Sequence, residues 1–266
     1  KWKKSEDVEA RADRVWSASE AQAIANAVRG KQATVTEESK PTTQASPLLF
    51  DLTSLQREAN GKFGFSAKTT LALAQALYEK HKALTYPRTD SRHLPEDYLP
   101  TTRQTLEMLA TSQHSHLAPF ARQALEHNYL RPTKRVFDNS QVSDHFAIIP
   151  TTQAPSGLSE AEQKLYDLVV RRFMAVFFPS AEYLVTTRIS KVEQAGGVPQ
   201  TQHFKTEGKV LVKPGWLAIY GKEIASEVPD AKEGDKGQNL VPVQPGERPL
   251  ASEVDAKALK TKPPAR

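Results

Sequence analysis

The 266-residue chain lacks cysteine and lacks any long apolar run. Without cysteine it can form neither disulfide bridges nor a thiolate metal site. Cysteine usage therefore does not indicate whether its compartment is reducing or oxidising. No stretch approaches the roughly 20 consecutive apolar residues that a membrane-spanning helix requires. The sequence therefore excludes a disulfide-stapled domain and predicts no membrane partner.

Charge is present in both signs with a small basic excess. The formal net charge is +5 and the pI about 9.2, with 38% hydrophobic and 25% charged residues. This composition is ordinary for a globular chain of one or two domains. The basic excess is compatible with a polyanionic partner, but it does not by itself select nucleic acid.

The first 47 residues predict a helix, a strand and a linker. Apolar residues recur at helical spacing over 18–28, with Ser17 or Ser19 available as the N-cap. Residues 32–38 alternate apolar and polar side chains, which predicts a short, half-exposed strand. The polar, proline-containing stretch 39–47 then reads as a linker at a domain boundary.

Helical periodicity dominates the middle of the chain, and alternation follows it. Ser159 and Glu162 have capping-box spacing at the start of one predicted helix. Lys213-Pro214-Gly215 is a turn signal. We predict helices at 52–60, 66–81, 95–112, 119–128 and 159–177. We predict strands at 183–189, 203–212, 216–220, 240–243 and 252–259, with a mobile loop at 222–239.

One short run carries the chemistry: Thr85-Tyr86-Pro87-Arg88-Thr89-Asp90-Ser91-Arg92. A tyrosine with an ordinary pKa near 10 is only about one part in a thousand phenolate at neutral pH, so a nucleophilic tyrosine needs a nearby cation or base. Arg88 supplies such a cation, and a guanidinium also binds phosphate oxygens in a bidentate fork. The structural alternative is a turn in which Tyr86 is half-buried and Arg88 pairs with Asp90.

Several blocks around this run resemble the active-site region of type IA DNA topoisomerases, bacterial topoisomerase III in particular. Their order along the chain also matches that family. The blocks are Leu55-Gln56-Arg57-Glu58-Ala59, residues 63–71, residues 74–79, residues 84–91, Ser143-Asp144-His145-Phe146-Ala147-Ile148-Ile149-Pro150-Thr151, and Lys260-Thr261-Lys262-Pro263-Pro264.

The resemblance implies an α+β fold in which a helical domain is inserted into a small β arch domain. The helical domain would carry a winged-helix unit like that of catabolite activators, and the arch would open as a gate. The implied segments are 1–30, the end of a helical base domain; 31–46, the first part of the arch; 47–180, the helical domain; 181–249, the second part of the arch; and 250–266, a return toward the base.

The resemblance also assigns roles to individual side chains. Tyr86 matches the nucleophile that stays joined to a 5′ phosphate, Arg88 the arginine on the scissile phosphate, and His145 a histidine near both. Phe146 departs from many relatives, which carry a polar or basic residue there. Thr85, Thr89 and Asp90 are expected to position the loop, and Gln75, Arg92, Lys134 and Arg135 to contact DNA.

The resemblance implies a magnesium site, but it lies in a domain of these enzymes whose acidic motif this sequence does not contain. Family members hold Mg²⁺ on a Toprim domain, yet no Asp-x-Asp-x-Glu pattern occurs here, and the chain starts without methionine. We therefore expect a central fragment of a bacterial, cytoplasmic enzyme, associated with nucleoid or plasmid. Its partners would be single-stranded DNA and the missing Toprim domain. The fragment would bind no metal and would not relax DNA alone.

Two alternatives remain open. One is a non-catalytic DNA-binding or dimerising winged-helix module. The other, a relaxase or tyrosine recombinase, fits less well, because His114-Ser115-His116 has no further ligands nearby and the apolar residue that relaxases place between the two histidines is replaced by Ser115.

Overall fold

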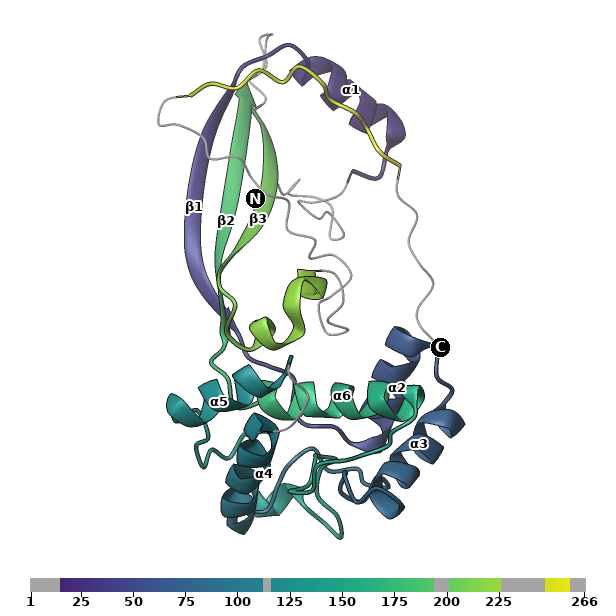
Figure 1. Cartoon of the computed structure of the whole chain (residues 1–266). Helices are drawn as coiled ribbons and strands as arrows, with labels where there is room; N and C mark the ends of the chain where they lie inside the picture. The colour runs from purple at the N-terminus through teal and green to yellow at the C-terminus, as the bar shows by residue number, and fades with distance from the viewer. Residues whose placement is uncertain (1–14, 112–115, 194–200, 226–246, 259–266) are drawn as a thin grey trace. The chain divides into compact units, whose positions relative to one another are not determined.

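The computed structural model describes residues 15–111, 116–193, 201–225 and 247–258. The chain divides into two compact units, each built from segments far apart in sequence (Figure 1). We call residues 1–41, 184–210 and 237–266 the strand unit, and residues 42–183 and 211–236 the helical unit.

The strand unit combines one helix with a three-stranded sheet in the order β1-β2-β3. Ser17 caps its helix by accepting a hydrogen bond from the Glu20 amide at 3.3 Å, as the sequence predicts. Buried apolar side chains are few in this unit: Val28, Ala33 and Val192 form a small cluster. The elements are α1 (Ala18–Val28), β1 (Ala33–Gln44), β2 (Ala181–Glu193) and β3 (Thr201–Lys213).

The predicted linker at 39–47 is partly wrong, because β1 continues through Pro41 to Gln44. Proline cannot donate a ladder hydrogen bond, so within a sheet it is confined to edge strands, strand starts and bulges. In the order β1-β2-β3, β1 is an edge strand. Its polar side chains are mostly exposed, and their run of Thr, Ser and Lys therefore reads like a loop in sequence.

The helical unit holds the larger apolar core. Helix α6 contacts α2, α3, α5 and η3, and residues on most of its faces are buried. The helices are α2 (Leu52–Phe63), α3 (Ala67–Glu79), α4 (Leu99–Thr111), α5 (Ala118–Glu126) and α6 (Glu160–Ala175), with short 3-10 helices η1 (Glu96–Tyr98), η2 (Asn139–Gln141) and η3 (Gly215–Ala225).

Local capping explains where two of these helices begin. Ser159 and Glu162 form the predicted capping box at α6, with the Ser159 amide donating to Glu162 Oε2 at 2.7 Å. Asp51 and Ser54 form a second box at α2. Each box satisfies amides that the first helical turn leaves without an internal partner.

Two predicted strands are absent. Residues 216–220 belong to η3, because Gly215 (φ +52) brings its backbone against Pro179, where a Cβ would lie 2.4 Å from the Pro179 carbonyl oxygen. Residues 252–258 form no strand either, and only Leu250 pairs, in a single bridge to Gln32. The predicted strand 240–243 and most of the predicted loop 222–239 lie outside the described residues.

No helix in the described part of the chain combines the length and apolar character needed to cross a membrane.

Candidate active site

Backbone hydrogen bonds join the two sequence blocks that the prediction singles out. The Thr85 amide donates to the Ile149 carbonyl at 3.0 Å, and the Ala147 amide donates to the His93 carbonyl at 3.0 Å. An antiparallel bridge pairs Leu84 with Pro150. Segments far apart in sequence are therefore held side by side at the edge of the helical core.

Two threonines lock this pairing with their side chains. The buried Thr85 hydroxyl donates to the Ala147 carbonyl at 2.9 Å and accepts from the Ile149 amide at 2.9 Å. The Thr89 hydroxyl donates to the His145 carbonyl at 3.0 Å. Both threonines thus fix the backbone on either side of Tyr86 against the segment that carries His145.

Tyr86 lies between two other rings. Its ring centroid is 4.3 Å from that of His145 and 5.5 Å from that of Tyr78, which meets it edge-on. Tyr86 is half-buried and His145 is exposed. The Tyr86 hydroxyl has no hydrogen-bond partner among the described side chains and backbone groups, so its ring is positioned while its oxygen is left available.

Arg88 and Asp90 do not form the ion pair of the structural alternative. Both side chains are exposed, and neither makes an ion pair within the described part of the chain. The ion pair of that alternative is therefore wrong for this structure, although Tyr86 is half-buried as the alternative expects. An exposed, uncompensated guanidinium two residues from the tyrosine is suited to accepting an anion.

Arg92 is held by the cap of α2. Its Nε lies 2.7 Å from Asp51 Oδ2, while Asp51 Oδ1 accepts from the Ser54 amide at 2.6 Å. Burial opposes ionisation of Asp51, but the hydrogen bonds from Ser54 and the charge of Arg92 outweigh it and lower the pKa of this carboxyl. The Leu52 amide also donates to the Thr89 carbonyl, so the start of α2 supports the Tyr86 segment directly.

The other predicted DNA contacts are dispersed. Arg135 donates to the backbone carbonyl of Ser46 and shares a pocket with Arg92. Lys134 is exposed, with its Nζ 3.9 Å from Glu96 Oε1. Gln75 is partly exposed in α3 and makes no hydrogen bond within the described residues. The structure thus brings Arg92 and Arg135 together and leaves the other two apart.

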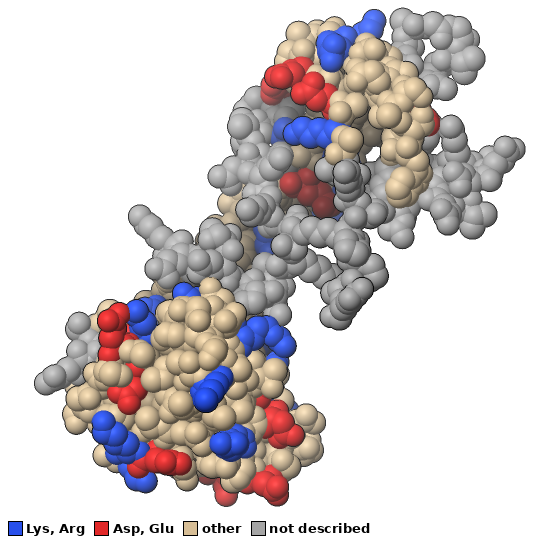
Figure 2. Space-filling view, turned by 90° about the vertical axis from the view of Figure 1, so that its right-hand side faces the viewer, with Lys and Arg blue, Asp and Glu red and all other residues tan. Residues whose placement is uncertain are grey.

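Basic side chains do not gather into one large patch on the face seen in Figure 2, where Lys and Arg are interspersed with Asp and Glu. The small net charge is therefore less informative than the local grouping of arginines around the pocket that Arg92 and Arg135 share.

Sequence reasoning missed several residues of the region. Tyr78 meets the Tyr86 ring, and Arg57, His93 and Arg172 line the same pocket as Arg92. Arg57 and Tyr78 lie within the blocks that resemble the family, but nothing in those blocks assigns them a role, and His93 and Arg172 lie outside the blocks. Phe146, which departs from the family pattern, packs against Tyr98 with ring centroids 4.7 Å apart.

The described residues contain no group of three His, Cys, Asp or Glu side chains that could hold a metal ion. His116 Nε2 lies 3.7 Å from Asp167 Oδ2, and His114 and Ser115 lie outside the described residues. The donors in the described part of the chain therefore do not fit a magnesium site.

Comparison with known proteins identifies the family to which the chain belongs. A DNA topoisomerase family model matches residues 1–266. The chain is 39% identical over 242 residues to DNA topoisomerase 3 of Bacillus subtilis, covering 90% of this chain and 31% of that protein. The corresponding Bacillus licheniformis protein is 39% identical over 257 residues, covering 95% of this chain and 33% of its own length.

A solved structure supports the fold. Full-length topoisomerase I from Thermotoga maritima matches with a TM-score of 0.53 at 22% identity, over 87% of this chain and 36% of that one. The chain thus spans about a third of the length of its curated relatives. The resemblance read from the sequence is confirmed: the chain belongs to the DNA topoisomerase family, as a type IA, topoisomerase III-like member.

Proposed function

We propose that this chain supplies the strand-cleaving residues of a topoisomerase III, with Tyr86 as the nucleophile. The observation that carries the proposal is the Tyr86 ring fixed against His145 at 4.3 Å, beside an exposed Arg88 without an acidic partner. A phenol ring against an imidazole, with an exposed guanidinium two residues along the chain, suits attack on a phosphodiester.

In the proposed step, the Tyr86 hydroxyl oxygen forms a bond to phosphorus and the bond from phosphorus to the 3′ oxygen breaks. The 5′ phosphate stays on Tyr86, and the proton released from the Tyr86 hydroxyl would be relayed by His145 to the leaving 3′ oxygen. Arg88 stabilises the added negative charge on the phosphate oxygens. Reversal of these steps rejoins the strand without ATP, because the phosphotyrosine bond retains the energy of the broken linkage.

Mg²⁺, held by a Toprim domain elsewhere in the enzyme, would neutralise phosphate charge. The substrate strand would be single-stranded DNA in the bacterial cytoplasm, and the full enzyme would relax and decatenate DNA. The 266-residue chain alone would be inactive in relaxation. The three-stranded sheet would form part of the gate, and the helical unit would include the winged-helix element.

Covalent capture tests the nucleophile. The chain is mixed with single-stranded DNA labelled at its 5′ or 3′ end, with and without Mg²⁺ and the separately made Toprim domain of a topoisomerase III relative. We expect the label to stay on the denatured protein only when it is at the 3′ end of the DNA, because the strand portion that begins with the 5′ phosphate remains joined to the protein. Tyr86→Phe should abolish this adduct, whereas Tyr129→Phe, at a tyrosine packed on Phe178, should leave it unchanged.

An adduct that persists in Tyr86→Phe would refute the assignment. DNA binding without any adduct, even with the Toprim domain present, would instead favour a non-catalytic DNA-binding module. Robust relaxation by the chain alone would contradict the expected dependence on the Toprim domain.

A further inference from the structure

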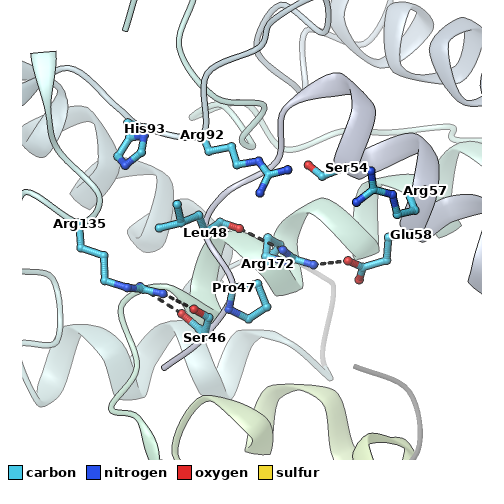
Figure 3. A pocket seen from close by; sticks show the side chains of 10 residues that line it. All are labelled: Ser46, Pro47, Leu48, Ser54, Arg57, Glu58, Arg92, His93, Arg135 and Arg172. Atoms are coloured by element: carbon cyan, nitrogen blue, oxygen red, sulfur yellow. Dashed lines mark hydrogen bonds and ion pairs between the residues drawn. The ribbon is translucent and has the colours of Figure 1, made fainter. Parts of the chain in front are cut away.

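A pocket of about 510 Å³ opens in the helical unit beside the start of α2. Figure 3 shows its arginine side chains converging from several segments of the chain. Arg57 comes from α2, Arg172 from α6, and Arg92 and Arg135 from the connecting loops. The lining residues, which we call the arginine pocket, are Ser46, Pro47, Leu48, Ser54, Arg57, Glu58, Arg92, His93, Arg135 and Arg172.

Positive charge exceeds negative charge in the arginine pocket. Glu58 pairs with Arg172, and Asp51, just outside the lining, pairs with Arg92. Arg57 has no ion-pair or hydrogen-bond partner within the described residues, and Arg135 bonds only to Ser46. Four arginines therefore face two carboxylates, which leaves an excess of two positive charges.

A buried donor without a partner gives a second, independent sign of an anion site. Arg172 is only 8% exposed, yet its Nε has no hydrogen-bond partner. Its other nitrogens bond to the Leu48 carbonyl at 3.0 Å and to Glu58 (Figure 3). A buried N–H donor left unpaired is costly, and an oxygen-rich anion that reached this nitrogen would reduce that cost.

Burial also disfavours the charged forms of two other basic groups in the pocket, Arg135 and His93. Burial lowers the pKa of Arg135 even though the residue as a whole is exposed. Burial is also the main cause that lowers the pKa of His93, and the charge of Arg135 adds to it against the opposing charge of Asp138. A bound anion would offset the desolvation of both side chains.

We propose that the arginine pocket binds a phosphate group, supplied by the backbone of a DNA strand or by a free nucleotide. Guanidinium forks match the oxygens of phosphate in bidentate geometry, and the two arginines without an acidic partner, Arg57 and Arg135, come from separate segments of the chain. The volume also falls within the roughly 300–1,000 Å³ typical of ligand sites. The proposal deepens the proposed function with a non-covalent site, and it needs no chemistry at Tyr86.

Two probes test the pocket on the 266-residue chain: a fluorescein-labelled dT12 strand and inorganic pyrophosphate. Arg57→Ala removes a side chain without structural partners, so the fold should be unaffected. We expect about tenfold weaker dT12 binding at low salt, and a salt dependence reduced by about one released counterion. The matched control Arg103→Ala, an exposed arginine of α4 outside the pocket, should change affinity less than twofold.

The two probes separate the two sources of phosphate. Weaker binding of dT12 by Arg57→Ala identifies a strand phosphate, whereas weaker binding of pyrophosphate alone identifies a free phosphate compound. Arg135→Lys, which keeps the charge but loses the fork, should weaken whichever probe binds. Equal binding by wild type and Arg57→Ala with both probes, or equal losses in Arg103→Ala, would overturn the proposal. These binding measurements do not depend on formation of a covalent adduct, so failure of the phosphotyrosine assignment remains distinguishable.

Discussion

Among single side chains, Thr85 does the most to join the two halves of the site. Its hydroxyl is buried, donating to the Ala147 carbonyl and accepting from the Ile149 amide. In Thr85→Val the shape is kept and both bonds are lost, so we expect a loss of about 2 kcal/mol in the free energy of unfolding. Urea denaturation measures it, and Thr85→Ser, which keeps the hydroxyl, should lose under about 1 kcal/mol. Equal losses in the two variants would contradict this reading.

The reach of sequence reasoning differs between side chains. Tyr86, Arg88 and His145 sit in runs whose residue order is distinctive, so the sequence singles them out without knowledge of the fold. Arg172 and Glu58 are different, because each is an ordinary charged residue on an amphipathic helix until α2 packs against α6. Their buried pairing, and the pocket beside it, follow from tertiary contacts that no local pattern encodes.

At the level of secondary-structure elements, the cap of α2 couples helix stability to the Tyr86 segment. Asp51→Ala removes the cap and the partner of Arg92, and should lower the free energy of unfolding by about 1–2 kcal/mol. Asp51→Asn keeps a good capping side chain and should lose less than half of that. Urea denaturation of both variants at neutral pH measures the two losses in the free energy of unfolding. If Asp51→Asn lost as much as Asp51→Ala, the effect would come from the charge of Asp51 and not from its capping hydrogen bond.

The same carboxylate predicts a pH dependence. The pKa of Asp51 in the folded chain is lowered from 3.8, so its contribution is fully present above about that value and is lost as the pH falls through the lower folded pKa. Between neutral pH and pH 3, wild type should therefore lose more stability than Asp51→Asn. Parallel pH profiles for the two proteins would contradict the coupling.

Helices were predicted best where a cap and the apolar periodicity agree. Ser159 and Glu162 form the predicted box, and α1 spans the predicted residues. Strands were predicted less well, because whether a segment forms a strand depends on the segments that it pairs with or packs against. Pro41 is accommodated only because β1 is an edge strand, and Trp216, Leu217 and Ile219 are buried together in η3 rather than alternating across a sheet.

Across the whole molecule, apolar burial is divided very unequally between the two units. The described part of the strand unit has a buried cluster of only Val28, Ala33 and Val192, with partly buried neighbours around it. The helical unit has a continuous core that includes most of α6. Since local opening is easiest where few apolar contacts resist it, the two units should differ in stability.

Amide hydrogen exchange followed by mass spectrometry tests this division. We expect the amides of β2, within residues 184–193, to exchange at least tenfold faster than those of α6, although β2 is hydrogen-bonded on both sides. Ladder hydrogen bonds protect an amide only while the sheet stays closed, and the small cluster around Val192 offers little resistance to opening. Equal protection of β2 and α6 would show that both units unfold in one cooperative step. It would then contradict a gate in which the strand unit opens separately from the helical unit.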